Sequence, residues 1–306
     1  MSASPPTILL IGASRGLGYA MVTEFLERGW NVVGTVRGGG SRTLLHELAD
    51  KYNGRVDIET LDICQPDQIQ ALDKRLSGKI FDVLFVNAGT TNRDPTQTIG
   101  EVSTEDFVHV MVTNSLSPMR VVEGLAHHVA PTGLIGVMSS GQGSISNNET
   151  GLREVYRGTK AALNMFMRSF AARRDPSRPM AVMAPGWVKT ELGGPDARLT
   201  IEESIPSLVN VLIAKKERPG LEYLDYLDMP KDKGQNKGVE APNARARNHA
   251  TQKAEHSEMG PSELLSEHMD SVGNPVPEPT WGATKNQPNE ESDLVEAMNA
   301  ETSEFM

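Results

Sequence analysis

The chain has 306 residues, 38% of them hydrophobic, with one cysteine and a formal net charge of −10 at pH 7. Such a chain can bury a large core and predicts one globular domain, or one domain with an appendage. A lone Cys64 excludes an internal disulfide framework and a Cys-rich metal site, and it favours a reducing, cytoplasmic setting. The acidic balance argues against nucleic acid as a partner.

The first apolar run is short, extending only from Ile8 to Ile11 before a glycine. A signal sequence or a membrane span needs a longer run. We therefore expect no targeting segment and no membrane partner.

From residue 7 to about residue 227, short β-branched runs alternate with longer segments of helical period. The predicted strands are 7–12, 31–36, 56–61, 81–87, 134–139, 179–184 and 221–225. Their continuous apolar character indicates burial on both faces. The pattern predicts a Rossmann-type, doubly wound parallel sheet of about seven strands in a three-layer α/β/α sandwich. After strand 179–184, Thr200 and Glu203 form a candidate capping box, but Pro206 would lie inside that helix and favours a start nearer Ser204.

Residues 1–228 are the predicted folded domain, and residues 229–306 are a predicted acidic extension. Acidic side chains outnumber basic ones in the extension, and Leu, Ile, Val and Phe are rare in it. They make up roughly 10% of the extension, below the roughly 20% that usually marks foldable sequence. This composition is typical of a disordered segment. Its two small apolar clusters, around Leu264 and from Leu294 to Met298, leave partner binding as an alternative.

A glycine-rich turn, Gly12-Ala13-Ser14-Arg15-Gly16-Leu17-Gly18, follows the first predicted strand. It precedes a predicted helix, Tyr19 to Glu27, whose amino end would favour a dinucleotide pyrophosphate. A plain strand-to-helix turn is the alternative, because a glycine turn alone is a weak signal.

The end of the second strand indicates which dinucleotide is preferred. An acidic side chain there would bind the ribose hydroxyls of NAD, but no Asp or Glu occurs between Arg28 and His46. The strand ends at Arg37 instead, and Arg15 lies in the glycine turn. Two guanidinium groups on one 2′-phosphate favour NADP(H) over NAD(H); two solvated arginines are the alternative.

Later strand ends carry further polar residues. Asp62 closes the third strand and Asn87-Ala88-Gly89 closes the fourth, at the edge where open α/β sheets bind ligands. Asp, Asn and Gly also favour turns, so a turn-forming role is the alternative for each.

Tyr156 and Lys160 are four residues apart in a predicted helix, 155–170, so they share one face. A phenol with a pKa of about 10 needs a shift of about 3 units to work near neutrality, and a nearby ammonium would lower it. Ser139-Ser140 ends the preceding strand, where a hydroxyl can hold a substrate oxygen. Taken alone, Tyr156 and Lys160 are better explained as an ordinary surface pair, and serines also end strands for no chemical reason. Together with the glycine turn and Asn87-Ala88-Gly89 in one βα series, the pattern indicates hydride transfer to or from a carbonyl.

In residues 6–227 the sequence resembles the classical short-chain dehydrogenase/reductase family. The matching motifs are the glycine turn, Asp62, Asn87-Ala88-Gly89, Asn114, Ser140, Tyr156, Lys160 and Pro185-Gly186-Trp187-Val188-Lys189-Thr190. The residues around Tyr156 and Trp187 look most like the carbonyl-reductase branch related to C-factor and sniffer proteins.

The resemblance implies a role for each matched residue. Tyr156 would be the general acid/base, Ser140 would orient the carbonyl, Lys160 would bind ribose and lower the phenol pKa, and Asn114 would hold a relay water. Asp62 would lie near adenine, and Val188 and Thr190 would contact the nicotinamide carboxamide. Ile63, Asn87, Ala88, Gly89, Pro185 and Gly186 would also bind the cofactor. A dimer or tetramer follows by analogy.

The chain departs from the family in three places. Ser140 lies somewhat further before Tyr156 than the family's commonest spacing, which leaves Ser139 and Ser144 as alternatives. Thr159 replaces the usual serine, and the chain continues far beyond its last predicted strand, to Met306. We expect no metal site, because adjacent His127 and His128 would point to different helix faces.

The expected function is NADPH-dependent interconversion of a carbonyl (an aldehyde, ketone or quinone) and an alcohol. The alternatives are a nucleotide-binding regulatory protein of C-factor type, and an enzyme whose extension recruits a protein partner.

Overall fold

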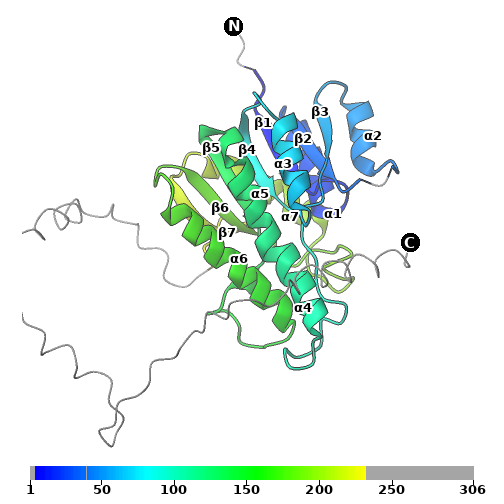
Figure 1. The fold of residues 1–306 in the computed structure, drawn as a ribbon, viewed down its shortest axis with the longest axis vertical. Helices are drawn as coiled ribbons and strands as arrows, with labels where there is room; N and C mark the ends of the chain where they lie inside the picture. The colour runs from blue at the N-terminus through cyan, green and yellow to red at the C-terminus, as the bar shows by residue number, and fades with distance from the viewer. Residues whose placement is uncertain (1–3, 39, 232–306) are drawn as a thin grey trace, which may run out of the picture. The chain divides into compact units, whose positions relative to one another are not determined.

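The computed structural model describes residues 4–38 and 40–231 (Figure 1). The chain divides into two units, Met1–Gly238 and Val239–Met306, and the described residues all belong to the first. The predicted boundary after residue 228 stays a prediction. The predicted disorder and apolar clusters of the extension lie outside the described residues, apart from residues 229–231.

Seven parallel strands form one sheet in the order β3-β2-β1-β4-β5-β6-β7 (strands labelled in Figure 1). They are β1 (Thr7–Ile11), β2 (Asn31–Val36), β3 (Val56–Thr60), β4 (Phe81–Val86), β5 (Val129–Met138), β6 (Pro179–Ala184) and β7 (Gly220–Asp225). The strand order reverses between β1 and β4, which is the switch point where doubly wound sheets bind ligands. The predicted fold class is confirmed.

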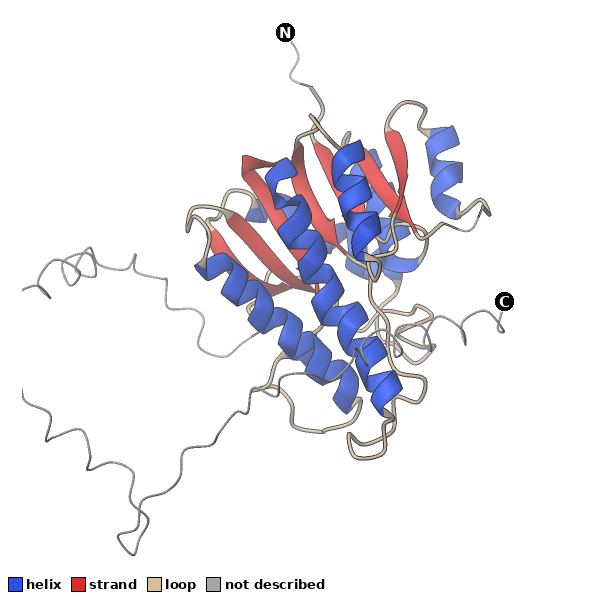
Figure 2. Ribbon diagram, viewed as in Figure 1, coloured by secondary structure: helices blue, strands red, loops and turns tan. Residues whose placement is uncertain are grey.

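Helices cover both faces of the sheet (Figure 2). The α-helices are α1 (Gly16–Glu27), α2 (Leu44–Lys51), α3 (Pro66–Arg75), α4 (Thr104–Met111), α5 (Ser117–Leu125), α6 (Glu154–Ala172) and α7 (Ile201–Lys215). Three short turns of other helix types are η1 (Val112–Leu116), η2 (Ala126–His128) and η3 (Gly141–Gly143).

Two apolar cores lie on opposite sides of the sheet. One joins alternate strand residues to α1, α2 and α7 and includes Phe25 and Phe85; the other joins the sheet to α3, α5 and α6 and includes Phe81 and Phe170. Each fully buried side chain of this size contributes about 2 kcal/mol by leaving water. This packing fixes the strand ends that carry the site.

The fifth strand begins at Val129, ahead of its predicted start at residue 134. Val129 pairs with Phe81, and the register then shifts so that Leu134 pairs with Val83. Pro131 and Gly133 interrupt the apolar run in between, and the sequence pattern therefore hid the beginning of the strand.

Helix α7 starts at Ile201 and is capped by Thr200, as the capping box predicts, and does not start near Ser204. The Thr200 hydroxyl accepts from Glu203 N at 3.3 Å, and the Glu203 carboxylate accepts from Thr200 N at 2.7 Å. Pro206 is accommodated inside the helix. The cap and the buried face of α7 offset the backbone hydrogen bond that proline removes.

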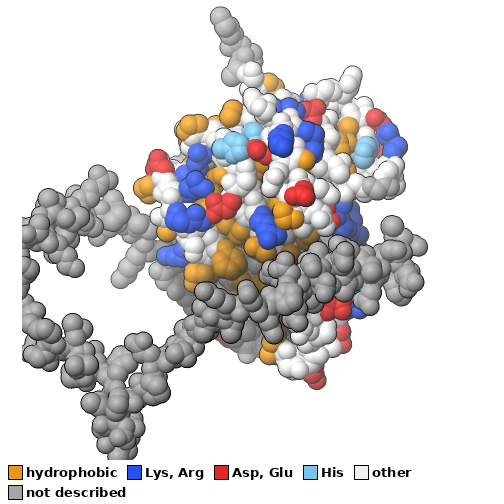
Figure 3. All heavy atoms as spheres, viewed as in Figure 1, with side chains coloured by type: hydrophobic (Ala, Val, Ile, Leu, Met, Phe, Trp, Pro, Cys, Tyr) orange, Lys and Arg blue, Asp and Glu red, His pale blue; other side chains and the backbone are white. Residues whose placement is uncertain are grey.

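The face of the molecule in Figure 3 carries Lys and Arg side chains interspersed with acidic ones over the described residues. No helix of residues 4–38 or 40–231 has the length and apolar character needed to cross a membrane.

Candidate active site

The glycine turn after β1 holds the backbone close to neighbouring strands. Gly12 has a φ of +85°, and a Cβ there would lie 2.9 Å from Ala88 N. A Cβ at Gly18 would lie 2.0 Å from Gly12 O. Neither position tolerates a side chain, and the turn leads into the amino end of α1, at Gly16. The cradle therefore fits a pyrophosphate bound by backbone N–H groups.

A threonine that the sequence pattern did not single out supports this turn. Thr35, buried in β2, accepts from Gly12 N through its hydroxyl at 2.9 Å and from Ala13 N through its carbonyl at 2.9 Å. Its signal in the sequence is a polar β-branched residue within a buried strand. Thr35 thus ties the turn to the neighbouring strand.

The two arginines expected at the 2′-phosphate, Arg15 and Arg37, have different surroundings. Arg15 Nη1 lies 2.5 Å from Glu191 Oε2, and both side chains are exposed. Arg37 is an exposed residue directly after β2. The structure thus gives Arg15 a carboxylate partner on the segment after β6, which the sequence did not predict.

The strand ends next to the turn carry Asp62 and Asn87. Asp62 Oδ1 accepts from Cys64 N at 2.9 Å, which shapes the loop containing Ile63. Asn87 Nδ2 donates to Gly12 O at 2.9 Å. Asn87 thus ties the end of β4 to the glycine turn, whereas the Asp62 bond lies within its own loop and agrees with the turn-forming interpretation of that residue.

The Ser140 side chain lies near the Tyr156 phenol and acts to lower its pKa, as a hydrogen-bond donor to the phenolate does. Ser140 caps η3 after β5 and accepts from Gln142 N at 3.2 Å, and its carbonyl accepts from the Tyr223 hydroxyl. Ser139 instead donates to Asn164 Oδ1 at 2.6 Å. Ser144 Oγ lies 3.2 Å from Ser146 Oγ. Among the three serine alternatives, Ser140 is therefore the one we place beside the phenol.

Burial raises the pKa of the Tyr156 phenol, while the Ser140 hydrogen bond and the charge of Arg153 act in the lowering direction. The expectation of a lowered pKa in this structure is therefore wrong. Lys160 Nζ lies 5.7 Å from the centre of the phenol ring and donates to Met138 O at 3.0 Å. Burial also lowers the pKa of Lys160 to about 8.

Arg153 is a site residue that the sequence did not reveal. Its guanidinium carbon lies 5.5 Å from the centre of the Tyr156 ring, and one of its terminal nitrogens donates to Leu192 O at 3.4 Å. Leu152 and Arg153 both have left-handed φ angles, 58° and 55°. Such strain is typical of functional segments, but a single arginine three residues before the tyrosine carries no distinctive sequence signal.

Asn114 lies in the π-helix η1, and its side chain links this helix to Thr159 of α6. Its side chain accepts from Thr90 N at 2.8 Å and donates to Thr90 O at 2.9 Å and to Thr159 Oγ1 at 3.0 Å. Thr159 in turn donates to Tyr156 O at 2.8 Å. The unusual threonine therefore connects Asn114 to the backbone of Tyr156.

Gly89 lies beside these groups. A Cβ at Gly89 would lie 3.3 Å from Asn114 Oδ1 and 3.4 Å from Lys160 Nζ. The missing side chain at Gly89 thus leaves open the space in front of the lysine and the asparagine.

The segment after β6 is held by its own contacts. Pro185 O accepts from Ser204 Oγ at 2.6 Å, and Gly186 has a φ of +85°. Val188 is buried, and Thr190 Oγ1 accepts from Gly193 N at 3.0 Å. This folded segment carries Glu191 toward Arg15.

The expectation that the two adjacent histidines point to different helix faces is wrong. His127 and His128 lie in the 3₁₀ turn η2, and both Nε2 atoms approach Asp73 Oδ1. The tighter winding and the end of the helix bring the two rings together, although consecutive residues of an α-helix would diverge.

The parallel sheet places the glycine turn, Asn87 and Ser140 at the carboxyl ends of the adjacent strands β1, β4 and β5. This fold, its nucleotide cradle and its Ser-Tyr-Lys arrangement define a dinucleotide-dependent oxidoreductase. The family model described as short chain dehydrogenase matches residues 6–198. The chain belongs to the short-chain dehydrogenase/reductase family and is an NAD(P)-dependent enzyme of that family.

Solved structures and a curated relative give the same family. A putative short-chain dehydrogenase/reductase from Burkholderia multivorans with bound NADP is 67% identical, with a TM-score of 0.74, and the match covers 75% of this chain and 100% of that one. A carbonyl reductase from Pseudomonas aeruginosa PAO1 in complex with NADP is 30% identical, with a TM-score of 0.68 and coverages of 74% and 99%. C-signal of Myxococcus xanthus is 32% identical over 148 residues, which are 47% of this chain and 88% of that protein. The predicted resemblance is confirmed.

Proposed function

We propose that this enzyme is an NADPH-dependent carbonyl reductase that reduces aldehydes, ketones or quinones. The observation that carries the proposal is the placement of Ser140, Tyr156 and Lys160 at the sheet edge where the nucleotide cradle lies, with Lys160 Nζ 5.7 Å from the centre of the Tyr156 ring. NADP(H), when bound, supplies or accepts the hydride. The NADP named for the Burkholderia and Pseudomonas structures supports the same cofactor here.

Tyr156 donates the proton in the direction of reduction. A phenol is protonated near neutral pH and can deliver a proton to a carbonyl oxygen, and Ser140 and the charge of Arg153 offset part of the rise in the Tyr156 pKa that burial causes. Ser140 holds that oxygen within reach and stabilises the charge that develops on it. Once the proton has been transferred, the positive charge of Arg153 stabilises the phenolate of Tyr156.

Lys160 and Asn114 position the cofactor and the proton path. The Lys160 ammonium lies beside Gly89, where it would bond the nicotinamide ribose. Asn114 would hold a water of the proton relay, while the cradle at Gly12, Ser14, Gly16, Leu17 and Gly18 would bind pyrophosphate. Asp62, Ile63, Asn87, Ala88, Pro185, Gly186, Val188 and Thr190 would line the rest of the cofactor site.

Arg15 and Arg37 favour NADP(H) over NAD(H). No acidic residue occurs from Arg28 to His46, and a 2′-phosphate makes stronger, charge-assisted bonds to guanidinium than a hydroxyl does. We also propose a cytoplasmic setting, a homodimer or homotetramer, and residues 229–306 as a segment able to recruit a protein partner.

The test is NADPH oxidation with a panel of aldehydes, ketones and quinones, followed by absorbance, for the wild type and Tyr156→Phe. We expect turnover that the substitution lowers at least about 100-fold without loss of NADPH binding measured by fluorescence. Turnover that survives the substitution would remove Tyr156 from its role, and no turnover with any carbonyl would count against the reductase.

A second candidate is a nucleotide-binding regulatory protein, which the 32% identity to C-signal favours. In a strain lacking the gene, Tyr156→Phe separates the two candidates. A cellular effect restored by the inactive variant supports regulation, whereas a failure to restore it supports the enzyme.

A further inference from the structure

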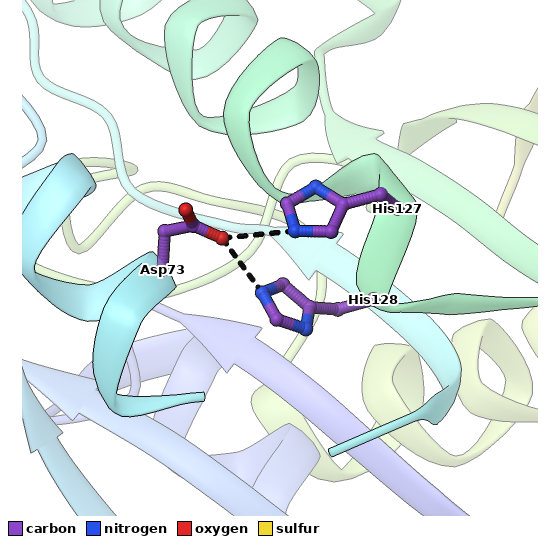
Figure 4. Close-up of side chains that lie close together, drawn as sticks. All are labelled: Asp73, His127 and His128. Carbon is purple, nitrogen blue, oxygen red and sulfur yellow. Dashed lines mark hydrogen bonds and ion pairs between the residues drawn. The ribbon is translucent and has the colours of Figure 1, made fainter. Parts of the chain in front are cut away.

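Three potential ligand atoms converge at the opposite end of the sheet from the catalytic residues. Asp73 Oδ1, near the end of α3, lies 2.9 Å from His127 Nε2 and 2.8 Å from His128 Nε2 in η2 (Figure 4). The cluster joins two segments that are far apart in the sequence. Its ligand atoms all lie within 4.8 Å of one another.

The contact that His128 makes through Nδ1 determines whether its Nε2 can donate a hydrogen bond or offer a lone pair. Nδ1 lies 3.1 Å from Lys79 O, and a carbonyl only accepts, so Nδ1 carries a hydrogen. The Nε2 lone pair of a neutral ring would then face a carboxylate oxygen at 2.8 Å, and two acceptors do not bond each other. A positive centre must lie between them, either a proton or a metal ion.

We propose that Asp73, His127 and His128 bind a divalent transition ion of the zinc type. Two imidazoles and one carboxylate are a common ligand set for Zn²⁺, with a fourth position open to water or another ligand. The bond from His128 Nδ1 to a backbone carbonyl is the usual outer contact of a ligating histidine, since it orients the ring and selects the tautomer.

The geometry needs only a small adjustment to hold such an ion. Tetrahedral bonds of about 2.0–2.1 Å separate ligand atoms by roughly 3.3 Å, so the present contacts of 2.8 and 2.9 Å must open by about half an ångström. His128 is buried and fixed, whereas His127 is 61% exposed and Asp73 is 40% exposed. The two exposed ligands can move, and they leave a solvent side for the fourth ligand.

Neighbouring cations have carboxylate partners of their own. Lys79 Nζ pairs with Asp57 at 3.1 Å, and Arg75 Nε pairs with Glu59 at 2.7 Å. Their repulsion of a bound ion is therefore reduced. The ion would tie the end of α3 to the start of β5 and, through the Lys79 carbonyl, to the segment before β4.

The proposed site acts on stability and not on hydride transfer. His128 directly precedes β5, and Ser140 lies two residues beyond the end of that ten-residue strand. At about 3.3 Å per residue, the site lies on the order of 30 Å from the catalytic serine. Metal binding should therefore leave the kinetics of NADPH oxidation unchanged.

The experiment is calorimetric titration of the tag-free, chelator-treated full chain with Zn²⁺, with Mg²⁺ for comparison, together with thermal unfolding. The variants are His127→Ala, whose side chain is exposed, and Asp73→Asn, which keeps its shape. His109→Ala is the matched control, because His109 is an exposed histidine on α4. X-ray absorption of the zinc-loaded protein counts the nitrogen ligands.

We expect one tight Zn²⁺ per chain, a higher Tm with zinc, no comparable effect of Mg²⁺ and two histidine ligands in the absorption spectrum. His127→Ala and Asp73→Asn should each weaken binding at least about tenfold, while His109→Ala should bind as the wild type does. Absence of tight binding, or equal affinity in all variants, would overturn the site and leave a proton between His128 and Asp73.

Discussion

Arg15 Nη1 lies 2.5 Å from Glu191 Oε2, so a residue of the nucleotide-binding turn is joined to the segment that follows β6. The side chains are 65% and 78% exposed, and such a pair contributes at most about 1 kcal/mol. A charge-assisted bond to a phosphate is worth about 1.5–3 kcal/mol. The cofactor phosphate should therefore displace the carboxylate.

Arg15→Gln should weaken NADPH binding about tenfold or more and change NADH binding much less. Glu191→Gln should alter NADPH affinity by only about twofold, in the direction of tighter binding. Fluorescence titrations with both nucleotides at two salt concentrations measure these effects. Equal losses for NADPH and NADH in Arg15→Gln would show that Arg15 does not read the 2′-phosphate.

Ser140→Ala should lower kcat about 100-fold because the hydroxyl beside Tyr156 is removed. Ser139→Ala should keep kcat close to the wild-type value but lower the free energy of unfolding by about 1–2 kcal/mol, since its buried bond to Asn164 is lost. Ser144→Ala should also keep kcat. Steady-state kinetics and urea unfolding of the three variants separate these roles; a kcat loss confined to Ser139→Ala or Ser144→Ala would assign the catalytic serine elsewhere.

Arg153→Met should raise the pKa of Tyr156, because the arginine charge favours the phenolate. Alcohol oxidation needs the phenolate as base, so the rise of kcat/KM with pH should move to higher pH and the rate at pH 8 should fall about threefold or more. Arg153→Lys should largely keep the wild-type profile. Unchanged pH profiles in both variants would show that this charge does not act on the phenol.

Lys160→Met should abolish turnover and yet stabilise the protein without cofactor at pH 7. Burial lowers the pKa of Lys160 to about 8 from an ordinary value of 10.5. The unfolded chain therefore binds more protons between these values, and wild-type stability should rise with pH from about 8 to 10.5. Lys160→Met should remove this rise in stability with pH. At pH 7 it should raise the free energy of unfolding by about 1–2 kcal/mol, because removing the buried charge outweighs losing the bond to Met138 O.

Urea unfolding of the wild type and Lys160→Met at pH 7 and pH 10 measures this difference. Lys189→Met, at an exposed lysine of the segment after β6, is the control and should leave the pH dependence unchanged. If Lys160→Met were less stable at pH 7 than the wild type, the favourable contacts of the Lys160 ammonium would outweigh the free-energy cost of burying it.

The sequence alone predicted the fold and most of the candidate site residues, because both depend on short local patterns of residues. Short runs rich in apolar and β-branched residues predicted all seven strands, since the strands of a covered parallel sheet bury most of their side chains. Positions such as Gly12 and Gly18 are forced by close backbone approach, and parallel strands bring their carboxyl ends to one edge. Residues that follow strands, such as Asn87 and Ser140, therefore had to meet there.

Tertiary structure alone decided which side chains pair. Ser139, Ser140 and Ser144 are chemically alike, and only the packing of η3 against α6 gives them different neighbours. The contact of Arg15 with Glu191 and that of Asp73 with the two histidines join segments far apart in sequence, where no periodicity operates. The raised pKa of Tyr156 likewise depends on burial by surrounding elements, because desolvation is a property of the packed site and not of any short segment.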